Sequence, residues 1–170
     1  METKKEIRFF FLPDFEKEER YLSDQHRQGW KFVENRYGYL FVFEKTIPDD
    51  VVYQLDFRPK ATDKEEYLQF FNDYGWEYVG DCNHFSYFRK KRAGEANEVY
   101  SDRQSKVDMI GRILKGQFLL AALVFVGMSF LFYGLKMYGG ILGMALVCLP
   151  IFLYSLIGLV RLRQKYQEVG

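Results

Sequence analysis

The chain of 170 residues has room for one ordinary soluble domain, or for a small domain with an added segment. Its formal net charge of +1 is an average over charged and apolar segments. Nearly all charged residues lie up to Lys115 and after Val160, and the segment between them is apolar. The two cysteines fall in these different segments, which excludes a disulfide-stabilised scaffold.

The N-terminal segment predicts a β-strand followed by a helix. Ile7, Phe9 and Phe11 alternate as side chains do along a half-buried strand. Asp14 is well placed to cap the helix, and Gly29 can take the left-handed conformation just past its end. Two short strands, KFVE and YLFVFEKT, complete a unit of strand, helix, strand, strand.

A second unit repeats this pattern. Val51, Tyr53, Leu55 and Phe57 alternate in its first strand, and Asp63 is placed to cap its helix. Identical residues recur at a constant offset of 46, as in Phe11 with Phe57, Pro13 with Pro59, Glu19 with Glu65, Tyr21 with Tyr67, Leu22 with Leu68, Gly29 with Gly75, Trp30 with Trp76 and Val33 with Val79. The sequence therefore predicts an internal duplication, with repeats at about residues 7–46 and 51–92, that forms one cytoplasmic α+β domain over residues 1–92.

Each unit places a glycine and then a tryptophan at the predicted end of its helix. In Gly29–Trp30 and Gly75–Trp76 the glycine can stop the helix while the tryptophan folds back on the last turn. The alternative is that the tryptophans stack on a ligand or a nucleobase. We favour the structural role, because the position relative to the helix end explains both pairs at once.

Residues 93–115 predict a linker followed by a juxtamembrane helix. The segment AGEAN, residues 93–97, has the composition of a linker. Val107, Ile110 and Leu114 then recur at helical spacing. We expect this helix to continue into the apolar segment that follows, so that movement of the N-terminal domain would be felt there.

Two apolar segments predict a transmembrane hairpin over residues 116–161. Residues 117–135 and 140–160 are each about long enough to cross roughly 30 Å of hydrocarbon as a helix. A buried hairpin in a soluble core would instead need polar residues at helical spacing on an outer face. Positive charge at both outer ends predicts two spans of the cell membrane, with both termini and the tail, residues 162–170, in the cytoplasm.

Four stretches of the sequence carry a family resemblance: FLPDFEKEERYLSDQHRQGWKFV, FEKTIPDDVVYQLDFRP, KEEYLQFFNDYGWEYV and YFRK. Together they cover roughly residues 10–92 and resemble the bacterial family called domain of unknown function 2812 (DUF2812). The resemblance implies a cytoplasmic domain of Gram-positive bacteria that is often followed by a membrane hairpin. It also implies that the gene tends to lie beside genes for PadR-like transcriptional regulators. It implies no catalytic residues.

Few residues could carry chemistry. Asp81, Cys82 and His84 lie within four residues, but a turn between two strands explains them more simply than a nucleophile or a metal site. His26 is expected to face solvent. We therefore predict no catalytic residue, no metal and no cofactor, and we expect the protein not to be an enzyme.

The predicted function is that of a membrane-anchored, non-enzymatic regulatory or sensory protein. Its duplicated domain would bind a small molecule or a protein partner, by analogy with soluble effector-binding domains that hold ligands between two similar halves. The alternative is an accessory or structural subunit of a larger membrane complex, such as a transporter. A third reading is an enzyme that uses the acidic runs at residues 16–19 and 63–66, which the helix dipole explains more simply.

Two sets of site residues follow from this interpretation. A ligand pocket between the halves would be lined by aromatic side chains, namely Tyr39, Phe41, Tyr53, Phe57, Trp76 and Tyr87. Contacts with lipid head groups would come from Arg89, Lys90, Lys91, Arg92, Arg112, Lys115, Arg161 and Arg163. Membrane lipids are thus expected partners and nucleic acid is not, while the GxxxG spacing of Gly139 and Gly143 adds a weak signal for a homodimer.

Overall fold

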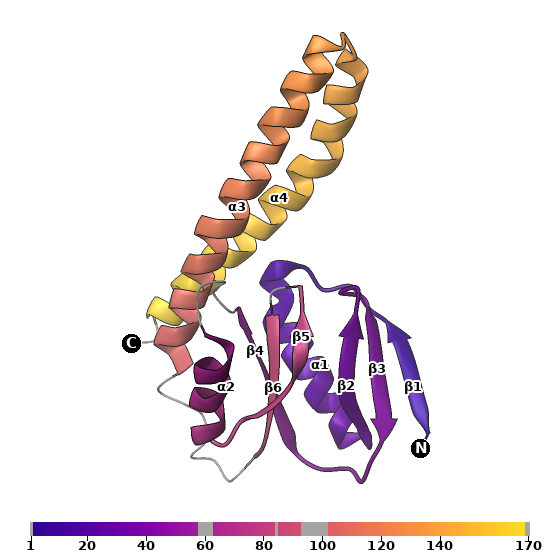
Figure 1. Cartoon of the computed structure of the whole chain (residues 1–170), viewed down its shortest axis with the longest axis vertical. Coiled ribbons are helices and arrows are strands. Elements are labelled where there is room, and N and C mark those ends of the chain that lie inside the picture. Colours follow the sequence, from indigo (N-terminus) through magenta and orange to yellow (C-terminus); the bar gives the residue numbers. More distant parts are fainter. Residues whose placement is uncertain (1, 58–62, 84, 93–101, 169–170) are drawn as a thin grey trace. The chain divides into compact units, whose positions relative to one another are not determined.

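The computed structural model describes residues 2–57, 63–83, 85–92 and 102–168. The chain divides into two compact units, Met1–Tyr100 and Ser101–Gly170, which we call the head and the hairpin. The head is a mixed α+β unit, and the hairpin consists of two long helices (Figure 1).

The head contains two antiparallel three-stranded sheets with the same strand order. The first sheet has the order β1-β3-β2 and consists of β1 (Thr3–Ile7), β2 (Trp30–Arg36) and β3 (Leu40–Lys45). The second has the order β4-β6-β5 and consists of β4 (Val51–Phe57), β5 (Glu77–Cys82) and β6 (Phe85–Lys91). Strand β2 also lies beside β5, so the two sheets meet at these strands.

Each sheet is accompanied by one helix, but the first helix serves both sheets. Helix α1 (Phe15–Arg27) follows a short 3-10 turn, η1 (Leu12–Asp14), and packs against both β2 and β4. Helix α2 (Lys64–Asp73) packs against β5. The fully buried side chains of the head include Phe15, Leu22, Phe32, Phe41, Phe43, Tyr53, Leu55 and Phe88. The core is therefore largely aromatic, and α1 contributes to it in both halves.

Two backbone features recur at the predicted offset. Gly29 has φ +83° and Gly75 has φ +77°, both just after the end of a helix. These values confirm the predicted helix stops, because side chains rarely adopt this left-handed conformation. Three residues later the ladders of β2 and β5 each shift register, at Phe32 and at Tyr78. The two halves thus share a helix stop and a β-bulge at matching positions.

The position predicted for the first strand was wrong. Strand β1 covers Thr3–Ile7, and Phe9 and Phe11 lie beyond its ladder with β3. The inward side chains of β1 are Lys4 and Glu6, which form hydrogen bonds with polar side chains of α1. No apolar alternation marks such a strand, so the pattern drew attention to the phenylalanines that follow it.

The helix caps also differ between the halves. Asp63 accepts a hydrogen bond from the backbone N–H of Glu65 at 2.8 Å, as predicted. The Asp14 carboxylate makes no such bond to α1 and instead accepts one from the N–H of Phe11 at 3.3 Å. Asp14 therefore closes the 3-10 turn before the helix rather than the helix itself.

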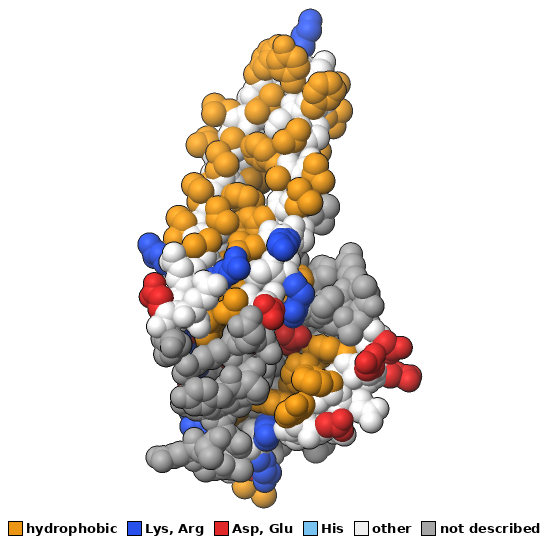
Figure 2. All heavy atoms as spheres, turned by 90° about the vertical axis from the view of Figure 1, so that its left-hand side faces the viewer, with side chains coloured by type: hydrophobic (Ala, Val, Ile, Leu, Met, Phe, Trp, Pro, Cys, Tyr) orange, Lys and Arg blue, Asp and Glu red, His pale blue; other side chains and the backbone are white. Residues whose placement is uncertain are grey.

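The hairpin consists of α3 (Asp102–Gly134) and α4 (Tyr138–Glu168), each long and apolar enough to cross a membrane. Helix α3 runs without a break through residues 102–115 and most of the first predicted span, whereas residues 93–97 lie outside the described ranges. Only 0% and 6% of the two apolar windows are buried, unlike the core helix of a soluble protein. Figure 2 shows hydrophobic side chains along the hairpin and Lys and Arg side chains toward its ends.

Candidate functional site

An open groove of about 860 Å³ lies at one end of the head. The end of α1, the start of β2 and the connection from β3 to β4 form one side of it. The start of β5 and the end of β6 form the other side. Both halves of the head therefore contribute to one concave surface, which is the usual form of a small-molecule site.

A buried histidine and tyrosine form part of the groove wall. His26 Nδ1 lies 2.8 Å from the hydroxyl of Tyr53, which also accepts a hydrogen bond from the N–H of Phe32 at 3.3 Å. The hydroxyl has both a proton to donate and a second lone pair, so the direction of its hydrogen bond with His26 follows the tautomer of the ring. Burial, with the positive charge of Arg89, lowers the pKa of His26, so the ring is neutral at pH 7.

The expectation that His26 faces solvent is wrong, since its side chain is only 6% exposed. Glu18, Leu22 and His26 follow one another at a spacing of four residues, which places them on one face of α1. That face packs against the strands and is buried at all three positions. The spacing was the signal in the sequence that could have identified this histidine.

Cations outnumber carboxylates in the groove. Its lining includes Lys31, Arg89, Lys90 and Lys91 against Asp49 and Glu77. The Arg89 guanidinium donates two hydrogen bonds to the Glu77 carboxylate, one of them at 2.8 Å. Lys91 Nζ lies 2.7 Å from the Asp49 carboxylate. Both carboxylates of the groove are therefore paired with Arg89 and Lys91, and neither is paired with Lys31 or Lys90.

Those two lysines have weaker or uncharged neighbours. Lys31 Nζ lies 3.9 Å from the carboxylate of Glu44, at the outer limit of an ion pair. Lys90 donates a hydrogen bond to the carbonyl oxygen of Tyr74 at 2.8 Å and lies over the Trp76 ring, 5.9 Å from its centroid. An anion in the groove could approach both ammonium groups without first separating a tight ion pair.

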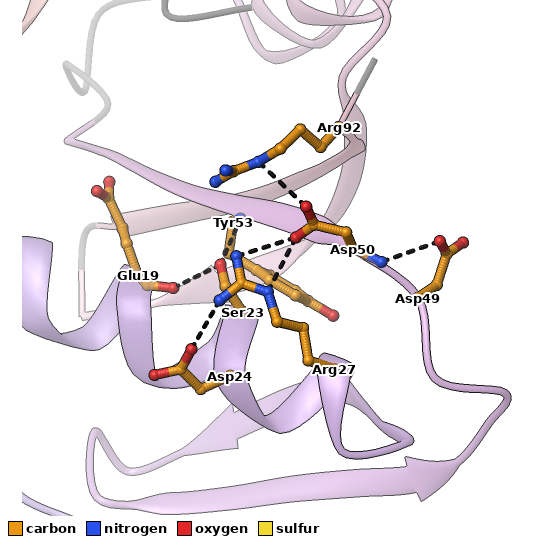
Figure 3. Close-up of polar contacts among 8 residues, drawn as sticks. All are labelled: Glu19, Ser23, Asp24, Arg27, Asp49, Asp50, Tyr53 and Arg92. Atoms are coloured by element: carbon orange, nitrogen blue, oxygen red, sulfur yellow. Dashed lines mark hydrogen bonds and ion pairs between the residues drawn. The ribbon is translucent and has the colours of Figure 1, made fainter. Parts of the chain in front are cut away.

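A network of charges fixes the connection from β3 to β4 against α1 (Figure 3). Arg27 pairs with Asp24 on its own helix and with Asp50, each at 2.9 Å. Asp50 also pairs with Arg92, just past β6, at 3.4 Å. These side chains are 44% to 61% exposed, so each pair adds little stability, but the network links three segments beside the groove.

The same helix satisfies the free edge of β4. The N–H of Tyr53 donates to the hydroxyl of Ser23 at 3.3 Å, and the N–H of Leu55 donates to the carboxylate of Glu19 at 2.8 Å. The Ser23 hydroxyl in turn donates to the Glu19 carbonyl oxygen at 2.9 Å (Figure 3). Because β4 is an edge strand, side chains of α1 replace a neighbouring strand there and hold the helix in register with the groove wall.

The six predicted ligand-binding aromatics do not meet in one place. Phe41, Tyr53 and Tyr87 are buried, Phe57 and Trp76 are half-buried, and Tyr39 is exposed. None of the six is among the residues that line the groove, although Trp76 lies between two that do, Gly75 and Glu77. The sequence analysis did not identify His26 or Lys31 as groove residues.

A buried carboxyl joins the halves elsewhere in the head. The Tyr87 hydroxyl donates to the Glu18 carboxyl at 2.7 Å and accepts from the Asn35 amide at 3.3 Å. Burial raises the pKa of Glu18 to about 7, and the same desolvation raises the pKa of Tyr87. Asn35 Oδ1 is buried without a hydrogen-bond partner. Because the pKa of Glu18 is raised to about 7, this cluster is sensitive to pH near neutrality.

A family model described as "Protein of unknown function (DUF2812)" matches residues 14–123. The chain belongs to the DUF2812 family. The match begins just before α1 and ends inside α3, so the DUF2812 region includes most of the head and part of the first apolar helix. The resemblance noted from the sequence motifs is confirmed. Comparison with curated proteins and with solved structures finds no match.

The other residues singled out in this DUF2812 sequence have ordinary structural neighbours. Asp81 accepts hydrogen bonds from Lys64 at 3.0 Å and from Ser86 at 2.7 Å. Cys82 is half-buried, and burial raises the pKa of its thiol, while His84 lies outside the described residues. In the described part of the chain, no group of three or more His, Cys, Asp or Glu residues could hold a metal ion.

The basic residues expected at lipid head groups lie in both units. Arg89, Lys90 and Lys91 end β6 and Arg92 follows it; Arg89, Lys91 and Arg92 form ion pairs within the head. Arg112 and Lys115 lie on α3, and Arg161 and Arg163 lie on α4. Their contact with lipid stays a prediction.

Proposed function

We propose that this chain is a membrane-anchored, non-enzymatic regulatory or sensory protein whose head binds a small anionic molecule. The observation that carries the proposal is the open groove, to which both halves contribute and in which cations outnumber carboxylates. A ligand held there touches both halves at once, so its binding energy can favour one packing of the halves over another. The excess of positive charge favours an anion.

The hairpin supports the anchoring part of this proposal. Both helices are long and apolar enough to span a bilayer, and almost none of their apolar length is buried. Two cations, Arg112 and Lys115, precede the apolar part of α3, and two more, Arg161 and Arg163, follow that of α4. The turn between the helices has one charged residue, Lys136. By the positive-inside rule we propose that both termini and the head are cytoplasmic.

We further propose that the two halves of the head arose by duplication. The shared helix stops and bulges support this, and so does a recurring hydrogen bond. The Tyr21 hydroxyl donates to Glu6 on β1, and the Tyr67 hydroxyl donates to Asp56 on β4 at 2.8 Å. Each bond joins a helix to the first strand of its own half. Two similar halves provide two sides of one groove, as in the effector-binding domains that share this order of elements.

The ligand can be sought without knowing its identity. Full-length protein purified in mild detergent should carry a small anion detectable by native mass spectrometry. A double variant with Lys31→Gln and Lys90→Gln removes the two least neutralised cations of the groove, and we expect it to retain at least tenfold less of that anion. The matched control is Lys17→Gln with Arg20→Gln, which removes two exposed charges of α1 outside the groove lining.

Three results decide between the candidates. Loss of the anion in the groove variant and its retention in the control support the proposal. Equal retention in both variants, or wild-type protein free of any bound small molecule, contradicts it. Wild-type protein that carries no anion but brings down a stoichiometric membrane complex would favour the accessory-subunit alternative.

A further inference from the structure

The end of the head opposite the groove presents an exposed aromatic surface. We call Ile7, Phe9, Tyr37 and Tyr39 the aromatic patch; their side chains are 64%, 74%, 78% and 39% exposed. The Phe9 and Tyr39 rings are stacked with centroids 5.7 Å apart, and the Tyr37 and Tyr39 rings are stacked at 6.0 Å. Strand β3 starts at Leu40 beside the patch and ends at Lys45 beside the groove.

The backbone at Tyr37 adopts a conformation that suits its side chain poorly. Tyr37 has φ +61° and Gly38 has φ +81°, the left-handed pair of a tight hairpin turn between β2 and β3. Asn is strongly preferred over Tyr at the first position of such a turn, and a bulky side chain there costs about 1 kcal/mol or more. The Tyr37 ring is also largely exposed and gains little from burial. The contact given for this ring is its stack on Tyr39, which is itself exposed, so an unfavourable backbone is kept for a pair of rings that faces outward and suits a use outside the fold.

We propose that the aromatic patch inserts into the head-group region of the same membrane that the hairpin crosses. The inference rests on the proposed membrane anchoring. Tyrosine and phenylalanine side chains at a surface are well suited to the membrane interface, where an apolar ring and a polar hydroxyl are both accommodated.

The length of the chain keeps the patch within reach of that membrane. Ten residues separate the end of β6 at Lys91 from the start of α3 at Asp102, and residues 102–116 of α3 precede the first apolar span. The ten-residue stretch spans at most about 40 Å, and the helical residues add about 22 Å. A tether this short raises the effective concentration of the patch at the bilayer, so that even a weak interfacial affinity suffices.

The charges around the patch predict how the contact responds to salt. Arg8 lies 3.7 Å from Glu6, and Arg36 is paired with Glu34, so these two cations each have a carboxylate beside them. The contact should therefore come from burial of rings rather than from attraction to anionic lipid. It should persist at 0.5 M salt, about where exposed charges are largely screened, unlike contacts made by the unpaired charges of a polybasic segment.

Fluorescence quenching in membranes tests the proposal on the full-length chain. The protein is reconstituted into vesicles of phosphatidylcholine and phosphatidylglycerol containing a spin-labelled lipid, with an environment-sensitive dye on one cysteine. With Cys82→Ser and Cys148→Ala as background, the dye is placed by Arg36→Cys beside the patch, or by Ile47→Cys at the groove end. Ile47 is 84% exposed and is the matched control. We expect at least twofold stronger quenching at position 36.

Two patch substitutions then separate membrane contact from folding. Adding Phe9→Ser and Tyr37→Asn to the Arg36→Cys protein should reduce quenching to the level at position 47. Because Asn suits the left-handed turn better than Tyr, Tyr37→Asn alone should leave the melting temperature unchanged or raise it. A loss of quenching together with unchanged stability supports insertion of the patch.

The remaining outcomes overturn the proposal in distinguishable ways. A dye on Cys148, in a Cys82→Ser protein, reports whether α4 is in the bilayer. Quenching at Cys148 with equal, weak quenching at positions 36 and 47 rejects the patch but leaves the anchor intact. No quenching at Cys148 rejects the anchor, and the patch proposal fails with it. Shielding of position 36 that grows with protein concentration, without lipid quenching, assigns the patch to contact between copies of the chain.

Discussion

The two halves of the head follow one plan but bury their helices to very different extents. Helix α1 buries Phe15, Glu18, Leu22, Ser23, Gln25 and His26, whereas Tyr67 is the buried residue of α2. The cause is topological, because α1 packs against strands of both sheets and α2 packs against β5. Matching sequence therefore predicts matching local structure, while the position of an element in the assembly decides how much stability it contributes.

The largest expected effect tests this difference at a pair of matched leucines. Leu22 is 0% exposed, and Leu68, its counterpart in α2, is half-buried. Leu22→Ala should lower the free energy of unfolding of the head by about 3 kcal/mol, because it removes a fully buried side chain and leaves a cavity. Leu68→Ala should cost about 1 kcal/mol, since less apolar surface is lost.

Both values can be measured by chemical unfolding of the full-length protein in mild detergent. The chain has two tryptophans, Trp30 and Trp76, and both lie in the head, so their fluorescence reports the head alone. If both substitutions lowered the free energy of unfolding equally, the two helices would contribute equally to the stability of the head, which would contradict the proposed difference between α1 and α2.

The second effect depends on a buried acid that the other half lacks. Glu18 is buried, while its counterpart Lys64 is exposed and pairs with Asp81. Burial raises the pKa of Glu18 from 4.5 to about 7. The folded head then binds this proton more tightly than the unfolded chain, so the stabilising contribution is complete below pH 4.5 and is lost as the pH rises toward 7.

Glu18→Gln should remove this dependence, because the amide oxygen can still accept the hydrogen bond from Tyr87. Between pH 4.5 and 7.5 we expect the wild-type head to lose about 3 kcal/mol relative to the Glu18→Gln variant, as a raised pKa of this size implies. His26 titrates with the opposite sign because its pKa is lowered, and comparison with the variant cancels its contribution. Lys64→Gln is the control; parallel pH profiles for wild type and Glu18→Gln would show that folding does not change the pKa of Glu18.

The sequence predicted those features of the head that depend on local rules. The glycine stops, the Asp63 cap and the alternation of Val51, Tyr53 and Leu55 follow from backbone preference and from period-two burial, and the structure has all of them. The two apolar helices were predicted from length and composition. Each of these signals is contained within about ten to twenty neighbouring residues.

The features that were missed depend on contacts between distant segments. Strand β1 has charged side chains on its inner face, because α1 provides polar partners for them there. His26 and Glu18 are buried because α1 packs across to β4, a strand of the other half. Lys31 and Lys90 line the same groove although they lie far apart in the sequence, on strands of different sheets. Contacts between segments this far apart cannot be read from the periodicity of a single sequence.

The smallest expected difference concerns the two helix stops themselves. Gly29 and Gly75 share a left-handed backbone, so replacing either by alanine costs about 1 kcal/mol from the conformation alone. Their surroundings differ, however. A Cβ on Gly29 would lie 2.9 Å from the carbonyl oxygen of Thr46, whereas one on Gly75 would meet only the flexible side chain of Lys90 at 3.4 Å.

Gly29→Ala should therefore cost about 2 kcal/mol and Gly75→Ala about 1 kcal/mol, because the backbone at Thr46 must move in the first case and the new Cβ fits beside Lys90 in the second. Thr46 donates its N–H to the Gly29 carbonyl at 2.9 Å and belongs to the groove lining, so Gly29→Ala should also weaken retention of the bound anion. Gly75→Ala, whose Cβ would only touch the Lys90 side chain, should cost less stability and leave retention nearly unchanged. Equal costs in the same tryptophan-monitored unfolding would mean that the Thr46 segment yields as readily as a lysine side chain, and the first helix stop would then have no special part in fixing the groove.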